Sequence, residues 1–266
     1  MQPPPTLFDR ELLAQRRARA TPEGAFLHIA IAEQVLERLN EVNKTFQDTL
    51  VIGPRADLWA KTVGGRGIPD TETLPLTESS QDLIIHALAL HWANDPVGQL
   101  IQMRRALRPD GMMIAALFGG QTLKELRTSL AEAETEIEGG LSPRVAPMGE
   151  IRDLGGLVQR AGLALPVADS TVLNVSYETP LHLMRDLRTM GETNVMIARR
   201  KTPMRRETLL RACEIYTHNY SEDGRIFATF EIIFLTGWAP HESQQKPLKP
   251  GSAQMRLADA LRTEDT

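Results

Sequence analysis

Alternating apolar strands and amphipathic helices in the middle of this chain constrain its fold more than any other feature. The run Gln81–Leu90 has the near-continuous apolar character of a parallel strand that is covered on both faces. A helical pattern follows and ends at Pro109-Asp110-Gly111, and Met112–Phe118 then reads as a second buried strand. A shorter β-branched run, Thr49–Gly53, predicts a first strand. Strands that alternate with helices predict an α/β protein with a mostly parallel sheet.

The segments around these strands divide the chain into three parts. Residues 1–47 combine a Pro-rich start, a charged stretch and a long apolar periodicity, which predict an N-terminal arm and helix. The charged stretch is expected to be a solvated helix or arm. Residues 48–243 are expected to form the α/β domain, in which residues 177–224 carry two helical patterns ahead of a last strand, Phe227–Trp238. Residues 244–266 are rich in Gln, Lys and Pro and predict a flexible tail.

Composition excludes several classes of protein. The 266 residues include 30 Lys and Arg against 34 Asp and Glu, so the net charge of −4 provides no general attraction for nucleic acid. Cys213 is the only cysteine, which excludes an intrachain disulfide and a thiolate metal cluster. The longest apolar runs are well short of the ~20 residues that span a membrane. We therefore expect a cytoplasmic protein without a metal site, a nucleic-acid partner or a membrane span.

Four sequence blocks stand out along the chain: FGGQTLKELRTSLAEAETEIEGGLSPRVAP, IRDLGGLVQRAGL, LMRDLRTMGETN and DGRIFATFEIIFLTGW. Together with Leu-Pro-Leu at Leu74 and the run after Gln81, they make the chain resemble the class I S-adenosylmethionine-dependent methyltransferases. Within them it is similar to the respiratory complex I assembly factor family that includes a mitochondrial protein-arginine hydroxylase. The malonyl-carrier-protein methyltransferase of biotin synthesis is a weaker likeness, seen in the helical insertion.

This resemblance implies a Rossmann-like class I methyltransferase fold. Its sheet would be mostly parallel with an antiparallel last strand, its first half would be shortened, and a helical insertion would precede the last strand. S-adenosylmethionine is the cofactor by family, and a complex I subunit is the implied protein partner. The cofactor positions carry over to Gly53, Pro54, Arg55, Asp70, His86 and Ala87.

The cofactor loop departs from the family pattern. Class I methyltransferases follow the first strand with a D-x-G-x-G-x-G pattern, whose glycines let the backbone approach the cofactor. Here Val51 replaces the leading acid, and Arg55 and Asp57 stand where glycines are expected. Gly53, Pro54 and Arg55 are then expected to form a strand-ending turn, with a remnant cofactor loop as the alternative. We therefore expect S-adenosylmethionine binding to be weak or absent.

The first half is also short. Only 21 positions separate Gly53 from Leu74, whereas one βαβ unit uses ~30 residues. The usual second strand and at least one crossover are therefore expected to be missing, together with the acid that holds the cofactor ribose. Asp70 matches the family position near the adenine, and an exposed loop acid is its alternative role.

Catalytic residues are sought at the carboxyl end of the middle strand, where open α/β sheets bind ligands. His86, His91 and Trp92 lie there, and a histidine can act as a general base near neutral pH, with a packed histidine as the alternative. The next helix, 122–138, begins with a Thr-x-x-Glu capping box and carries an acidic face expected to be solvated. A structural ion pair of Glu125 with Arg127 is the alternative to a site role. The catalytic candidates are His91, Glu125 and Arg127.

Two segments are suited to covering a substrate cleft. The loop Gly139–Pro147 is bounded by Gly and Pro, and the helix terminus at Met190 contains Gly191, a residue typical of helix C-termini. Capping is the alternative role of this terminus. The substrate-groove candidates are Trp92, Thr122, Ser142, Arg144, Met190, Glu192 and Asn194.

These observations leave three functional hypotheses. The first is a methyltransferase-fold protein that acts on or binds a protein segment, as the assembly factors imply, with impaired S-adenosylmethionine binding. The second is an active S-adenosylmethionine-dependent methyltransferase on a small acid or a carrier-bound acyl group. The third, a hydroxylase, needs an oxygen-activating group, and the sequence has no obvious set of two histidines and one carboxylate.

Overall fold

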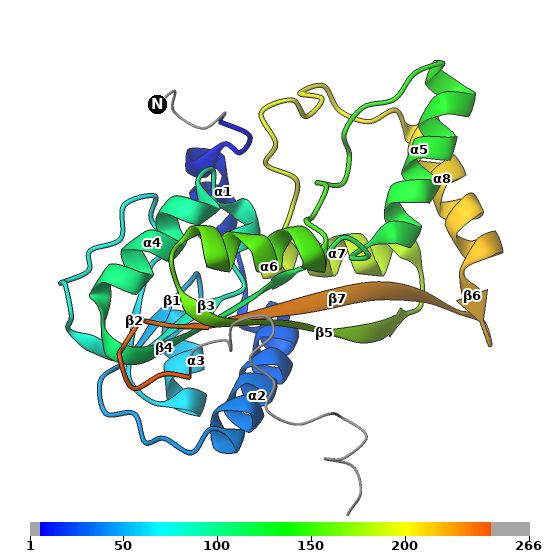
Figure 1. Cartoon of the computed structure of the whole chain (residues 1–266). Coiled ribbons are helices and arrows are strands. Elements are labelled where there is room, and N and C mark those ends of the chain that lie inside the picture. Colours follow the sequence, from blue (N-terminus) through cyan, green and yellow to red (C-terminus); the bar gives the residue numbers. More distant parts are fainter. Residues whose placement is uncertain (1–5, 246–266) are drawn as a thin grey trace, which may run out of the picture.

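A single mixed sheet forms the centre of the computed structural model, which describes residues 6–245 (Figure 1). The sheet order is β2-β1-β3-β4-β7-β5, and β6 pairs with β7. The strands are β1 (Thr49–Ile52), β2 (Arg66–Ile68), β3 (Gln81–Ala87), β4 (Leu107–Phe118), β5 (Ala164–Tyr177), β6 (Ser221–Glu222) and β7 (Arg225–Trp238). The helices are α1 (Arg10–Arg17), η1 (Pro22–Ala25), α2 (Phe26–Glu41), α3 (Ala56–Val63), η2 (Leu90–Trp92), α4 (Pro96–Ala106), α5 (Lys124–Glu138), α6 (Ile151–Arg160), α7 (Pro180–Met190) and α8 (Arg206–Asn219).

The strand directions confirm the expected Rossmann-like methyltransferase arrangement. β1, β3 and β4 are parallel neighbours, as the three apolar runs predicted. β7 is the last strand of the described residues and runs antiparallel to both β4 and β5. The sheet is therefore mostly parallel in its first half, and its antiparallel edge forms after the helical insertion.

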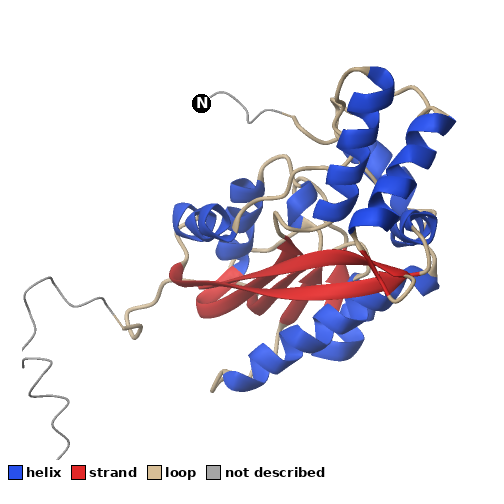
Figure 2. Cartoon of the chain, turned by 90° about the vertical axis from the view of Figure 1, so that its right-hand side faces the viewer, coloured by secondary structure: helices blue, strands red, loops and turns tan. Residues whose placement is uncertain are grey.

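Helices cover both faces of the sheet, which explains why the central strands are apolar throughout (Figure 2). On one face, α2 and α3 pack against the sheet through residues such as Ile31 and Trp59, which join Val51 and Ile85 in one core cluster. On the other face, α4 and α6 belong to a second cluster with residues such as Ile84. Alternate residues of β1, β3 and β4 therefore belong to different cores.

The expectation of a missing second strand is wrong. β2 is only three residues long, but it pairs in parallel with β1, from Leu50 opposite Arg66 to Ile52 opposite Ile68. The connection fits because α3 has eight residues and Gly64 and Gly65, both at positive φ, turn the chain directly into β2. The first half of the sheet is short because the described chain has no further strand or helix between β2 and β3.

The start of α5 also differs from the expected capping box. The residue before the helix is Leu123, at a left-handed φ of 55°, and no side chain caps the first turn. The Thr122 hydroxyl donates to the Glu231 carbonyl and accepts from its amide, while buried Glu125 accepts a hydrogen bond from the Thr229 amide. Thr122 and Glu125 therefore tie α5 to β7 instead of to each other.

The insertion before the last strand contains the two expected helices, α7 and α8. The segment that follows α7 reaches the carboxyl ends of the parallel strands, because Glu192 contacts His91 there. Helix α8 instead lies side by side with α5, and its Tyr216 hydroxyl donates to the Phe227 carbonyl of β7 (Figure 1). Of the insertion, therefore, only α7 and its following loop cover this edge of the sheet. The expected tail, 244–266, falls outside the described residues from 246 onward.

Candidate functional site

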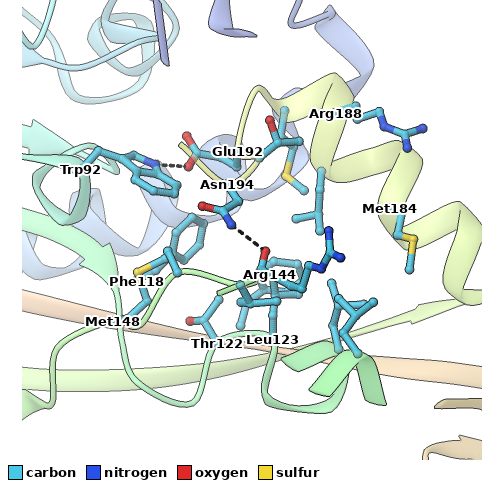
Figure 3. Close-up of a pocket in the computed structure, with 18 of the residues that line it drawn as sticks. Trp92, Phe118, Thr122, Leu123, Arg144, Met148, Met184, Arg188, Glu192 and Asn194 are labelled. Carbon is cyan, nitrogen blue, oxygen red and sulfur yellow. Dashed lines mark hydrogen bonds between the residues drawn. The ribbon is translucent and has the colours of Figure 1, made fainter. Parts of the chain in front are cut away.

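A largely apolar pocket of about 200 Å³ opens above the carboxyl ends of β3 and β4 (Figure 3). Phe118 at the end of β4, Trp92 in η2 and Phe230 of β7 form its aromatic walls. α5 closes one side with Leu126, and α7 closes another with Leu187. The position agrees with the general rule that open α/β sheets bind ligands outside the carboxyl ends of their strands.

Four methionines make the wall adaptable. Met184 and Met190 of α7, Met148 of the loop before α6 and Met204 of the loop before α8 all line the pocket. Unbranched, polarizable methionine side chains adjust to differently shaped apolar ligands. Such a wall suits an apolar or long side chain better than a single rigid small molecule.

Most of the residues proposed from sequence for a substrate groove meet in this pocket. Ser142 lies apart from the lining and instead binds the Glu134 carboxylate through its amide and hydroxyl. The groove candidates that line the pocket are Trp92, Thr122, Arg144, Met190, Glu192 and Asn194.

Glu192 is the buried charge at the edge of the pocket. Its side chain is 5% exposed and accepts hydrogen bonds from Trp92 Nε1 at 2.5 Å and His91 Nε2 at 3.3 Å. Burial alone would raise the pKa of Glu192, but the His91 hydrogen bond and the charge of Arg17 outweigh it and lower this pKa to about 2. Glu192 is therefore ionised at neutral pH, with Arg17 Nη2 3.5 Å from Oε1.

Polar bonds hold the loop over the pocket. Asn194 donates from Nδ2 to the carbonyls of Pro143 and Arg144, and Arg144 pairs with Glu134 at 2.7 Å. Glu134 is 2% exposed, so the expectation of a solvated acidic face is wrong at this position. Gly191 has a positive φ and caps α7, and the capping role expected for this terminus therefore coexists with the pocket contacts of Asn194.

The side chain of Asp70, at the expected cofactor place, is enclosed by the chain's own arginines. Asp70 is 7% exposed, so the expectation of an exposed loop acid is wrong. Arg17 Nη1 lies 2.9 Å from both carboxylate oxygens, and Arg10 Nη2 lies 3.0 Å from Oδ2. Burial would raise the pKa of Asp70, but Arg17 and Arg10 lower it below its ordinary value. The carboxylate is ionised and already paired.

The other cofactor candidates have structural contacts. A Cβ at Gly53 would lie 2.5 Å from the Ala87 carbonyl, so close approach of β1 to β3 requires this glycine. Arg55, which follows Pro54, donates to the Thr21 carbonyl at 2.6 Å. His86 is fully buried beside Gln99, and burial lowers its pKa to about 4, so it is neutral. None of the six cofactor candidates lines the apolar pocket.

The catalytic candidates also lie outside the pocket lining. His91 is 2% exposed, packs against Phe118 at 4.8 Å between ring centroids, and leaves its Nδ1 without a partner among the described atoms. Glu125 is buried against Thr229, and Arg127 donates to the Gly120 carbonyl at 3.3 Å. The alternative ion pair between Glu125 and Arg127 is absent from the described contacts, since each binds a different partner. No group of three or more His, Cys, Asp or Glu within residues 6–245 could hold a metal ion.

Sequence reasoning missed the role of α1. The charged N-terminal stretch was expected to be a solvated helix or arm, but Arg10 and Arg17 pack inward with Leu13. A signal existed, because residues seven apart lie on the same helix face and Leu13 lies between them. The role of this helix face can be recognised only in the folded chain, where Asp70 and Glu192 lie opposite it.

Comparison with known proteins identifies the family. A family model described as a methyltransferase domain matches residues 60–115. The YcgJ protein from Bacillus subtilis has a crystal structure that covers 79% of this chain and 99% of its own, with a TM-score of 0.50 at 13% identity, which supports the fold alone. None of the described helices is long and apolar enough to cross a membrane.

Sequence relatives are closer. The malonyl-[acyl-carrier protein] O-methyltransferase of Laribacter hongkongensis is 34% identical over 68% of this chain and 59% of that protein. The mitochondrial arginine-hydroxylase NDUFAF5 of Danio rerio is 41% identical over 87% of this chain and 71% of its own length. The same protein of Rattus norvegicus is 44% identical over 98% of this chain and 85% of its own. This identity along most of both chains, on a methyltransferase fold, shows that the chain belongs to the arginine-hydroxylase NDUFAF5 family.

Proposed function

We propose that this chain binds a segment of a protein partner in the apolar pocket, and that its binding of S-adenosylmethionine is weak or absent. The partner we propose is a subunit of respiratory complex I, as the resemblance to the assembly factors implies. One observation carries the proposal: the groove candidates gather around an open pocket, whereas the carboxylate expected to hold the cofactor is paired with Arg10 and Arg17.

The chemistry of the pocket supports a long cationic side chain as the anchor. Methionines and aromatic rings can pack against an aliphatic stem, and the ionised Glu192 lies at the pocket edge. A guanidinium binds a carboxylate through two parallel hydrogen bonds. Since the relatives are named arginine hydroxylases, we propose arginine as the side chain that enters the pocket.

The residues at the cofactor place do not fit S-adenosylmethionine as they are arranged. Asp70 has Arg17 on both oxygens and is no longer free to accept hydroxyl groups. Pro54 lacks an amide hydrogen, and Arg55 fills space that the family leaves to glycine. Cofactor binding there would require Asp70 to leave its buried ion pairs with Arg17 and Arg10, which is costly.

Calorimetric titration tests the cofactor part of the proposal. S-adenosylmethionine and S-adenosylhomocysteine are expected to give no saturation up to about 1 mM. A dissociation constant at or below about 10 μM would overturn this part. It would favour the active methyltransferase on a small acid or carrier-bound acyl group, which the malonyl-carrier-protein relatives support.

Fluorescence anisotropy tests the pocket. The probe is a labelled, terminally blocked peptide with one central arginine flanked by apolar residues. Met184→Trp fills the pocket and is expected to weaken binding at least about tenfold, whereas Leu181→Trp, on the same helix but 51% exposed and outside the lining, leaves it unchanged. Equal binding by both variants, or no binding by the unmodified chain at about 1 mM, would contradict the proposal.

A further inference from the structure

A second cavity, of about 460 Å³, lies between α1 and α7 and is lined by four arginines. Arg16 and Arg19 contribute from the α1 side, and Arg185 and Arg188 contribute from α7. We call it the arginine cleft. Arg188 also lines the apolar pocket, and Figure 3 shows its side chain turned away from Trp92 and Phe118.

No salt bridge within the described chain neutralises the arginines of the arginine cleft. No carboxylate of residues 6–245 lies within salt-bridge distance of any of the four guanidiniums. Arg16 instead donates to the Thr193 hydroxyl. Burial and the neighbouring charges of Arg199 and Arg19 lower the pKa of Arg16 and outweigh the opposite effect of Asp9. The described chain thus gathers like charges that repel one another, although its arginines elsewhere commonly pair with Asp or Glu.

The geometry favours an extended anionic ligand over a single small anion. The arginines face the cavity from two different helices, and its volume lies in the range of sites that hold drug-sized ligands. One phosphate would leave most of this space empty, whereas a chain segment with several carboxylates would reach all four guanidiniums through charge-assisted hydrogen bonds.

The apolar pocket and the arginine cleft share two lining residues, Arg188 and Thr193, so one ligand can occupy both. We propose that the arginine cleft binds an acidic stretch of the same partner segment whose side chain enters the apolar pocket. This inference rests on the proposed function and adds the partner's chemistry: acidic residues next to the anchoring side chain. The opposite charges of the arginine cleft and of the acidic partner segment would also favour association of the two proteins.

Anisotropy with a fluorescein-labelled hexaglutamate peptide tests the arginine cleft alone, using the full chain. We expect the double variant Arg19→Glu/Arg185→Glu to weaken hexaglutamate binding at least about tenfold at ~0.1 M salt. Both side chains are exposed and lack side-chain hydrogen bonds within the described region, so folding is expected to be retained. Arg19→Gln/Arg185→Gln, which removes charge without reversing it, should give an intermediate loss.

The matched control is Arg105→Glu/Arg160→Glu, which changes the net charge equally at exposed positions remote from the arginine cleft. It should alter hexaglutamate binding less than about twofold. An equal loss in this control, or no hexaglutamate binding by the unmodified chain, would overturn the inference. Displacement by submillimolar inorganic phosphate would assign a simple oxyanion site instead. Arginine-dependent binding to phosphatidylglycerol vesicles without hexaglutamate binding would assign a lipid surface.

The variant Met184→Trp separates the two proposals. It fills the apolar pocket without changing charge, so it should retain hexaglutamate binding while losing the arginine peptide. Hexaglutamate binding without arginine-peptide binding would contradict the proposed function but not the arginine cleft. The opposite pattern would contradict only the arginine cleft.

Discussion

At the scale of single residues, burial decides what an arginine–aspartate pair contributes. Arg17 is mostly buried against Asp70, whereas Arg108 and Asp48 form an equally close pair whose side chains are 44% and 51% exposed. Removing one partner of a buried pair leaves a charge without compensation, and exposed pairs contribute little. We expect Arg17→Met to lower the free energy of unfolding by about 2–4 kcal/mol, measured by urea denaturation.

The matched substitution Arg108→Met should cost less than about 1 kcal/mol. Similar losses in the two variants would mean that the Arg17 pair is not effectively buried. The interpretation of the N-terminal helix as the cover of Asp70 would then fail.

At the scale of secondary-structure elements, the end of α7 depends on a close approach to α1. Gly191 has a φ of 79°, and a Cβ there would lie 3.0 Å from the Arg17 Cα. Gly139, which ends α5 at a φ of 69°, has open space around it. We expect Gly139→Ala to cost about 1 kcal/mol of unfolding free energy through backbone conformation alone, and Gly191→Ala to cost more because α1 must also move.

Limited proteolysis reports the displacement of α1 directly. Cleavage within residues 10–20 should accelerate in Gly191→Ala and stay unchanged in Gly139→Ala. Equal cleavage rates would show that contact with α7 does not hold α1 in place.

At the scale of the whole molecule, buried titratable groups make stability depend on pH. The pKa of Glu192 is lowered to about 2 in the folded chain, so its contribution is present above its unfolded pKa near 4.5 and is lost as the pH falls toward 2. Between pH 5 and 3 this loss is about 2 kcal/mol. We expect Glu192→Gln to reduce the fall in unfolding free energy over this range by about that amount.

Other groups titrate in the same range and need a control. Burial lowers the pKa of both His28 and His86 to about 4, so each also destabilises the fold as the pH falls from 6.5 toward 4. The contribution of His86 is shared by the unmodified chain and the variant and cancels in the difference. Glu192 raises the pKa of His28, so its removal lowers that pKa further and offsets part of the expected reduction. Glu178→Gln, at a side chain that is 71% exposed, should leave the profile unchanged. A Glu192→Gln profile parallel to the unmodified one would contradict the buried ionised state.

The sequence alone determined the elements whose signal is local. Apolar runs such as Leu83–Ala87 and Met112–Phe118 must be buried on both faces, and this requirement predicted the parallel strands and their order with intervening helices. Six of the seven residues that the sequence suggested for a groove, among them Thr122 and Met190, likewise line the pocket. A strand as short as Arg66–Ile68 has no such signal, because three half-exposed residues form a strand only through pairing with β1.

Only the tertiary structure decided which charged side chains meet. Asp70 is 53 positions from Arg17, and Trp92 is 100 positions from Glu192. Hydrogen bonds and ion pairs act over a few ångströms, so their partners depend on how distant segments pack and not on local pattern. The same packing decided that α1 covers the expected cofactor place, and that its outer arginines and those of α7 form one cleft.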